Sequence, residues 1–227
     1  MQRRSLLLMA PRRLAWVAEV LPAPGPHEIL VQTTAGAVSV GTELPQYMGT
    51  EREIAARGYP RMTGYESLGT VVACGSEVTS VEPGDRVVAF YGHRTSALIP
   101  EPKAIRVPAG VSDALALLVI LTCDVAKGVR KLSPRPDQPA LVSGAGAIGL
   151  LTLWVLRASA VREVDVVEPL AARRELALRL GARRAVSPES ADLEDAYAIG
   201  FECSSRQAGF ALLQQRAATN GRLCMLA

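Results

Sequence analysis

The sequence has few of the residues that nucleic-acid and metal sites require. Aromatic residues make up 4% of the 227 residues, and the 25 lysines and arginines are nearly balanced by 22 acidic residues. With a formal charge of +3 and few aromatic platforms for stacking, a nucleic-acid partner is not expected. Only two histidines are present, and the four cysteines are too far apart for a metal motif or a disulfide scaffold. We therefore expect a protein of the reducing cytoplasm.

Long apolar runs are absent as well. No segment approaches the roughly 18 uninterrupted apolar residues of a membrane helix, so no membrane partner is expected. Residues 1–10 have a basic head and an apolar run like those of a signal peptide, but the run is short and Pro11-Arg12-Arg13 follows at once. A first β-strand is the favoured interpretation. Because 49% of the residues are hydrophobic, the chain has ample material for a packed core.

The pattern of the chain changes near residue 140, which predicts two domains. The first part has short β-rich runs between glycines and prolines, with strands expected at 14–20, 28–34, 70–78, 96–99 and 104–107 and a polar loop at 42–62. An apolar helix is expected at 113–130, followed by a Pro-rich connector at 132–139. We place the domain boundary between residues 131 and 132 and assign the linking helix to the first domain, although the sequence pattern allows it on either side.

The second part alternates strands and helices, which predicts an α/β fold with a doubly wound parallel sheet. Strands are expected at 140–143, 164–168, 197–203 and 221–227. Helices are expected after Gly149, at 171–180 and at 207–218.

A glycine-rich turn follows the first of these strands. Gly144-Ala145-Gly146-Ala147-Ile148-Gly149 reads as G-x-G-x-x-G and opens an apolar helix. The first glycine permits a tight turn, the second lets backbone approach a pyrophosphate, and the third lets the helix pack against the strand. The helix N-terminus then points its amide dipoles at the phosphates. Glycine-rich turns also occur without a nucleotide, but here a strand precedes the turn and a second strand follows the helix.

That second strand ends in Glu168, at the spacing expected of the acid that holds the adenosine ribose hydroxyls. A carboxylate there repels a 2′-phosphate, so NAD is favoured over NADP. Arg173 and Arg174 keep NADP open as an alternative, and a solvated strand end is the alternative for Glu168. Ser204 and Ser205 are placed to line the carboxyl edge of the sheet, or to form a plain turn. The predicted cofactor-binding residues are Gly144, Gly146, Ala147, Ile148, Gly149, Glu168, Arg173 and Ser204.

The order of motifs along the chain resembles the medium-chain dehydrogenase/reductase superfamily, whose zinc-type members are alcohol dehydrogenases. The motifs are Gly41-Thr42-Glu43, Gly64-Tyr65-Glu66-Ser67-Leu68-Gly69, Pro83-Gly84-Asp85-Arg86-Val87 and the later nucleotide fold. The resemblance covers nearly the whole chain. It implies a GroES-like catalytic domain followed by a Rossmann domain, and hydride transfer between a nicotinamide cofactor and a small alcohol or carbonyl substrate.

Departures from the superfamily pattern concern the metal. Where zinc-dependent members carry a cysteine and a histidine, this sequence has Val40 and Tyr65. The third ligand position falls near Ile120, with Cys123 one helical turn away, and the four-cysteine lobe of a structural zinc is missing. A catalytic zinc needs three protein ligands around an open position, so no metal is predicted.

Without zinc, other groups must stabilise the substrate oxygen. Thr42 matches the hydroxyl that relays the proton in zinc relatives, and Tyr65 has a phenol that both donates and accepts. The hypothesis is that these two hydroxyls bind the substrate oxygen while Glu66 and Glu43 orient them. The alternatives are that Tyr65 only fills the space of the missing ligand and zinc, and that Thr42 only satisfies backbone in a turn.

Three further alternatives stay open. The motifs around Val40, Tyr59 and Tyr65 look most like the branch that contains bacteriochlorophyllide dehydrogenase. The superfamily pattern continues beyond Ala227, so a dinucleotide-binding protein without turnover, or a truncated fragment of a longer chain, is a second hypothesis. A quinone or enone reductase of the same superfamily is a third. A sheet edge left unpaired favours a homo-oligomer.

Overall fold

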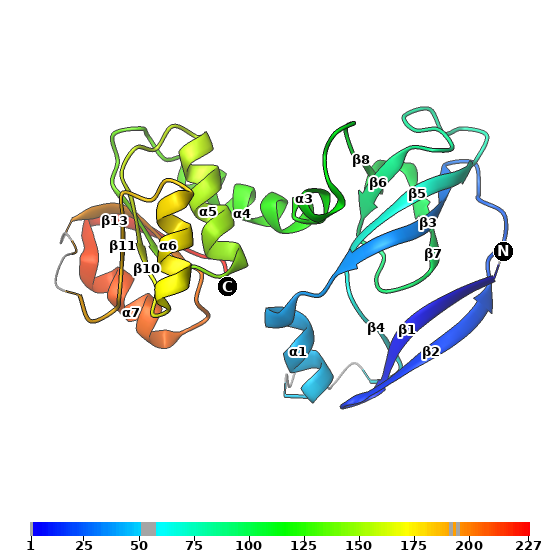
Figure 1. Cartoon of the computed structure of the whole chain (residues 1–227), viewed down its shortest axis with the longest axis horizontal. Coiled ribbons are helices and arrows are strands. Elements are labelled where there is room, and N and C mark those ends of the chain that lie inside the picture. Colours follow the sequence, from blue (N-terminus) through cyan, green and yellow to red (C-terminus); the bar gives the residue numbers. More distant parts are fainter. Residues whose placement is uncertain (1, 51–57, 191–192, 194–195) are drawn as a thin grey trace. The chain divides into compact units, whose positions relative to one another are not determined.

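The computed structural model describes residues 2–50, 58–190, 193 and 196–227. The chain divides into two compact units, Met1–Ile120 and Leu121–Ala227, and each is described here by itself (Figure 1). This division falls before the expected boundary at 131/132, because Val125 and Val129 of the linking helix belong to the core of the second unit. None of the described helices is long and apolar enough to cross a bilayer.

The first unit is built around a five-stranded antiparallel sheet in the order β7-β3-β5-β6-β8. Its strands are β3 (Glu28–Ala37), β5 (Glu66–Cys74), β6 (Arg86–Ala89), β7 (Ser96–Pro100) and β8 (Ile105–Arg106). Ile29, Val31 and Val71 are buried in its core. The expected strands are confirmed, although β5 begins earlier than expected because Glu66 pairs with Ala37 at the end of β3.

A smaller sheet in the order β2-β1-β4 completes the strands of this unit. The strands are β1 (Gln2–Ala10), β2 (Arg13–Val20) and β4 (Arg61–Met62). The expected first strand is thus confirmed as one arm of a hairpin, whose turn contains Arg12 in a left-handed conformation.

The prediction of a polar loop at 42–62 is wrong in its first part. Helix α1 (Val40–Met48) starts there and ends at Gly49, which has a φ of 70°. The sequence does not predict this helix because Gly41 and Pro45 are residue types that disfavour a helix interior. The rest of the expected loop includes residues 51–57, which lie outside the described residues.

The expected helix at 113–130 is interrupted. Helix α3 (Asp113–Leu117) ends at Leu118, and α4 (Val119–Leu132) begins directly after it. Ser112 caps α3 by accepting a hydrogen bond from the amide of Leu115. A short 3-10 turn, η1 (Glu101–Lys103), precedes β8.

The second unit has a five-stranded parallel sheet in the order β11-β10-β9-β12-β13, as predicted for a doubly wound fold. Its strands are β9 (Ala140–Ser143), β10 (Val164–Val167), β11 (Arg184–Val186), β12 (Tyr197–Glu202) and β13 (Ala217–Met225). Its helices besides α4 are α5 (Ala147–Ala158), α6 (Ala171–Arg179) and α7 (Gln207–Arg216). Strand β11 was not predicted, because three residues are too few for an alternating pattern. Strand β13 begins earlier than expected.

Helices cover both faces of this sheet, which explains why β9 and β10 are buried along their whole length. Side chains of α4, α5 and α6, among them Leu153 and Ala177, pack with one face. Leu213 of α7 packs on the other face with Leu141 and Val167. The carboxyl ends of β9, β10 and β12 therefore form one edge, at which ligands bind in open α/β sheets.

A buried carboxylate ties three strands of this sheet together. Asp165 of β10 is fully buried and accepts hydrogen bonds from Arg183 Nε (2.9 Å), Arg184 Nη2 (2.7 Å) and the Tyr197 hydroxyl (2.5 Å). Burial alone raises the pKa of Asp165, but the hydrogen bonds from the two arginines and the tyrosine outweigh it and hold the pKa below 3.8. The carboxylate is therefore a fixed charge in the native state.

Replacing Asp165 with alanine is expected to lower the free energy of unfolding by about 3 kcal/mol at pH 7, because two arginines then lose their buried partner. Since the pKa is lowered on folding, the contribution is present above pH 3.8 and disappears as the pH falls through the native value. Urea denaturation measures the change. Asp124→Ala is the control, since the exposed Asp124–Lys127 pair contributes little. Equal stability of the two variants would contradict the prediction.

Candidate active site

The glycine-rich turn joins β9 to α5. Gly144 has a φ of 95°, which favours glycine, and a Cβ on Gly149 would lie 1.9 Å from the Gly144 carbonyl oxygen. A Cβ on Gly146 would meet nothing within 4 Å. The first and third glycines are therefore required by the turn and the helix–strand contact, whereas the second leaves open space above the backbone.

The first turn of α5 offers amide groups to a ligand. The first helical hydrogen bond runs from the Leu150 amide to the Gly146 carbonyl, so the amides of Ala147, Ile148 and Gly149 have no acceptor within the helix. These groups carry the positive end of the helix dipole. A phosphate group fits such a site.

A pocket of about 830 Å³ lies at this edge of the sheet, within the second unit. Of the predicted cofactor-binding residues, the ones that line it are Gly144, Gly146, Glu168, Arg173 and Ser204. The other three, Ala147, Ile148 and Gly149, form the first turn of α5. The pocket has the size of a cofactor site.

Glu168 is only 4% exposed, so it is not a solvated strand end. Its Oε2 accepts a hydrogen bond from the Ala145 amide (2.8 Å), and its Oε1 accepts one from the Leu170 amide (2.9 Å). Each carboxylate oxygen still has a free lone pair for a ligand hydroxyl. Glu168 thus holds the glycine-rich turn and lines the pocket at the same time.

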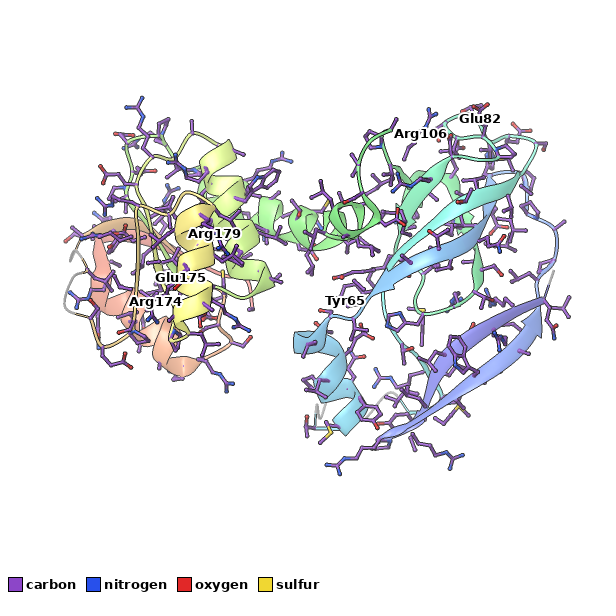
Figure 2. All side chains as sticks on the ribbon, in the orientation of Figure 1. Tyr65, Glu82, Arg106, Arg174, Glu175 and Arg179 are labelled. Carbon is purple, nitrogen blue, oxygen red and sulfur yellow. The ribbon has the colours of Figure 1, made fainter. Side chains whose placement is uncertain are left out.

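The two arginines that follow have different surroundings. Arg174 donates hydrogen bonds from Nη1 to the carbonyl oxygens of Glu168 and Pro169, so it is committed to the backbone. Arg173 lines the pocket with its Nη1 4.0 Å from Glu168 Oε2, and its side chain is half exposed. Figure 2 labels Arg174 on α6 together with Glu175 and Arg179.

One residue of this edge escaped the sequence analysis. Glu202 ends β12, is 1% exposed, and accepts hydrogen bonds from the amides of Ser204 (2.8 Å) and Ser205 (3.2 Å) and from the Ser204 hydroxyl. It holds Ser205 at a φ of 53° and so fixes the turn that carries Ser204. Glu202 lies at the carboxyl end of β12, as Glu168 lies directly after β10, and a strand expected to end at residue 202 instead of 203 would have pointed to it.

In the first unit, Tyr65 directly precedes β5 (Figure 2). It is half-buried, and its ring stacks on Phe90 with 5.2 Å between centroids. Thr42 is exposed in the first turn of α1. Within the described part of the chain neither hydroxyl has a hydrogen-bond partner, so both are available to a ligand.

Glu66, next to Tyr65, is the buried member of the predicted catalytic set. It is 3% exposed, and its Oε1 has no hydrogen-bond partner among the described residues. Burial, and then the negative charge of Glu43, raise the pKa of Glu66 to about 6. Glu66 therefore gains or loses a proton near neutral pH.

Glu43 has a partner that the sequence did not predict. Its Oε2 lies 2.9 Å from His93 Nε2, and its Oε1 accepts a hydrogen bond from the Ser39 amide (2.9 Å). The imidazole packs so closely on Gly64 that a Cβ there would lie 2.4 Å from the ring. His93 and Glu43 are distant in sequence, and only the fold brings them together.

The residues at the expected metal position offer few ligands. Val40 is 64% exposed, and Cys123 is exposed on α4 of the second unit. Among the residues that the structure describes, no group of three or more histidine, cysteine, aspartate or glutamate side chains is placed to hold a metal ion. This donor set does not fit a zinc site, and zinc independence stays a prediction.

Glu66→Gln is expected to raise the free energy of unfolding by about 1–2 kcal/mol at pH 8, because the variant removes a buried charge. A carboxyl whose pKa is raised on folding makes the wild type lose stability as the pH rises from 4.5 to about 6. The free energy of unfolding is measured by urea titration at pH 4.5 and at pH 8. For the variant, this contribution to the difference between the two pH values should be absent. Glu82→Gln, at an exposed position labelled in Figure 2, is the control and should behave as wild type. A less stable Glu66→Gln protein at pH 8 would refute the prediction.

Comparisons with known proteins extend over both units. Residues 25–105 match the alcohol dehydrogenase GroES-like domain. The chain is 26% identical to the L-threonine 3-dehydrogenase of Aliivibrio salmonicida, over 100% of this chain and 77% of the relative. It is 25% identical to that of Pectobacterium atrosepticum, over 98% of this chain and 72% of the relative.

Solved structures show the same fold. One is a dehydrogenase of Sinorhizobium meliloti, described as zinc-binding and bound to NADP, with a TM-score of 0.85 and 21% identity over 100% of this chain and 77% of the other. Another is a short chain alcohol dehydrogenase of Escherichia coli with NADH, with a TM-score of 0.83 and 21% identity over 98% and 75%. A third is the 2R,3R-butanediol dehydrogenase of Bacillus subtilis, with a TM-score of 0.82 and 20% identity over 97% and 76%.

Proposed function

We propose that the chain is an alcohol dehydrogenase-like member of the medium-chain dehydrogenase/reductase superfamily, and that it transfers hydride between a nicotinamide cofactor and an alcohol or carbonyl substrate. The observation that carries the proposal is the glycine-rich β9–α5 turn, whose amides and open backbone face a pocket of about 830 Å³. In this proposal residues 1–131 form the catalytic domain and residues 132–227 the cofactor domain. The substrate is a small molecule.

The residues of the pocket suit a dinucleotide. The backbone at Gly146 and the first amides of α5 would hold the pyrophosphate, and Glu168 would accept hydrogen bonds from the adenosine ribose. When bound, the nicotinamide accepts or supplies the hydride. NAD is the favoured cofactor, because the Glu168 carboxylate repels a 2′-phosphate and Arg174 is held by backbone carbonyls. Arg173 keeps NADP as the alternative.

In the first unit, the substrate oxygen needs donors in place of a metal. When an alcohol is oxidised, its carbon loses a hydride to the nicotinamide and its oxygen loses a proton. The hydroxyls of Tyr65 and Thr42, which have no partner among the described residues, would bind that oxygen. The Glu66 and Glu43 carboxylates bond to neither hydroxyl in this structure and would orient them only once the substrate is bound. In this proposal the proton passes from the alcohol oxygen through the two hydroxyls to solvent water. Glu66, with a pKa of about 6, is ionised at neutral pH, and its negative charge favours that transfer. The cytoplasmic location, the possible homo-oligomer and the bacteriochlorophyllide-like branch remain predictions.

Glu168→Gln is expected to narrow the preference for NADH over NADPH about tenfold, which corresponds to ~1.4 kcal/mol, because the variant removes the repelling charge and keeps an acceptor for one amide. Fluorescence titration with each nucleotide measures both dissociation constants. Glu175→Gln, on the exposed face of α6, is the matched control and should keep the wild-type ratio. An unchanged ratio in Glu168→Gln would remove Glu168 from the cofactor site.

Tyr65→Phe is expected to lower kcat at least tenfold with little change in stability, because the ring still stacks on Phe90 while the hydroxyl is lost. Steady-state oxidation of an alcohol with NAD gives the rate, and thermal unfolding checks the fold. Tyr59→Phe serves as the control, since its hydroxyl has no role in the proposal. A Tyr65→Phe enzyme with the wild-type kcat would show that Tyr65 only fills space.

A further inference from the structure

Strand β2 is an outer strand of the small sheet β2-β1-β4 (Figure 1). Its even-numbered residues share one face, because side chains alternate along a strand, and they are Leu14, Trp16, Ala18 and Val20. All four are apolar and exposed, with exposed fractions of 45% for Leu14, 56% for Trp16 and 80% for Val20. An outer strand with such an apolar stripe is a template for pairing with another chain.

The bonds of β1 show which backbone groups of β2 point away from the sheet. The Leu6 amide of β1 donates to the carbonyl oxygen of His93 (2.8 Å), on the side away from β2. Because successive residues of a strand bond to opposite sides, the odd-numbered residues of β1 bond β2. Ser5 and its partner Val17 form one such pair. The backbone groups of the even-numbered residues of β2, Trp16 among them, therefore point to the outer edge.

The two charged residues of β2 lie at complementary positions. Arg13 and Glu19 are both exposed, and Trp16 lies midway between them in the sequence. Among the described residues, the partners of Glu19 are Arg3 and Ser5, and both contact Oε1. Oε2 keeps its lone pairs for another donor. A second copy that runs antiparallel, with Trp16 opposite Trp16, brings each Arg13 opposite the Glu19 of the other copy.

Several conditions select this register. It pairs even-numbered with even-numbered residues, as the outward backbone groups require. Of the antiparallel registers that do so, it alone brings Arg13 opposite Glu19. It also places the two indole rings directly across from each other, and aromatic pairs across strands are stabilising. Arg4 lies over the Trp16 ring, with 5.7 Å to its centroid, which orders the indole before a partner arrives.

We propose that a second copy of this chain pairs with β2 in this antiparallel register and joins the two small sheets into one continuous sheet. Both copies then present the same surface across a twofold axis, which requires that the surface complement itself. Arg13 and Glu19 meet that requirement, and for this reason the fitting occupant is the chain itself. The inference goes beyond the proposed activity and does not depend on it. An interface of one strand from each copy is small, so we expect weak, concentration-dependent association.

The test removes the central aromatic pair and, separately, reverses one charge. Trp16→Ala removes the indole, and Trp154→Ala on α5 is the matched control, at a tryptophan that is 51% exposed against 56% for Trp16. Arg13→Glu places like charges opposite each other. Its control is Arg12→Glu, at an exposed arginine of the hairpin turn, with the same change in net charge. Sedimentation equilibrium over a concentration series measures each dissociation constant, and circular dichroism checks the fold.

The expected result is association of wild type and of both controls, and about tenfold or greater weakening in Trp16→Ala and Arg13→Glu, since each substitution acts twice across the axis. A wild type that stays monomeric up to about 1 mM would leave β2 to a different occupant and overturn the inference.

Wild-type association of Trp16→Ala would place the dimer on another surface, and wild-type association of Arg13→Glu would contradict the register, so either result would also overturn it. If Trp16→Ala fails to fold, Arg13→Glu at its exposed position decides alone.

Discussion

The close contact between the start of α5 and the end of β9 is the constraint on which the second unit depends. Gly149 lies against the Gly144 carbonyl, and no side chain fits between them. The contact leaves the first amides of the helix directed at the sheet edge, where Glu168 fixes the turn through the Ala145 amide. The pocket follows from this arrangement, since its walls are the ends of β9, β10 and β12. Glu202 has the same role at the end of the neighbouring strand β12, where its buried carboxylate accepts hydrogen bonds from the turn that contains Ser204.

In the first unit the important feature is a pair of neighbouring carboxylates, Glu43 and Glu66, of which only Glu43 has hydrogen-bond partners for both oxygens among the described residues. Glu43 is satisfied by His93 and the Ser39 amide, but its charge makes ionisation of the nearby Glu66 more difficult. An unpaired carboxyl in a buried site costs stability, and such sites are often functional. The arrangement supports the proposed role of this region in proton transfer.

Much of the fold was predictable because its signals are local. The glycine turn, the acid after the following strand and the alternation of strands and helices gave the second sheet and its order of elements. Local signals failed where they were ambiguous. Helix α1 was missed because Gly41 and Pro45 lower the helix propensity of residues 40–48. Strand β11 was missed because it has only three residues, and the bond from Arg184 to Asp165 of the neighbouring strand forms only in the folded sheet.

The sequence by itself indicated the family resemblance and the two-part architecture, and it singled out Gly144, Gly146, Glu168, Thr42 and Tyr65 as candidates, because these rest on residue types at fixed spacing. Only the tertiary structure decided which side chains meet. The Glu43–His93 pair joins residues far apart in the chain, and the raised pKa of Glu66 comes from burial and from the charge of Glu43. Burial and through-space charge depend on distances that spacing along the chain does not fix. For the same reason only the fold shows that β2 is an outer strand.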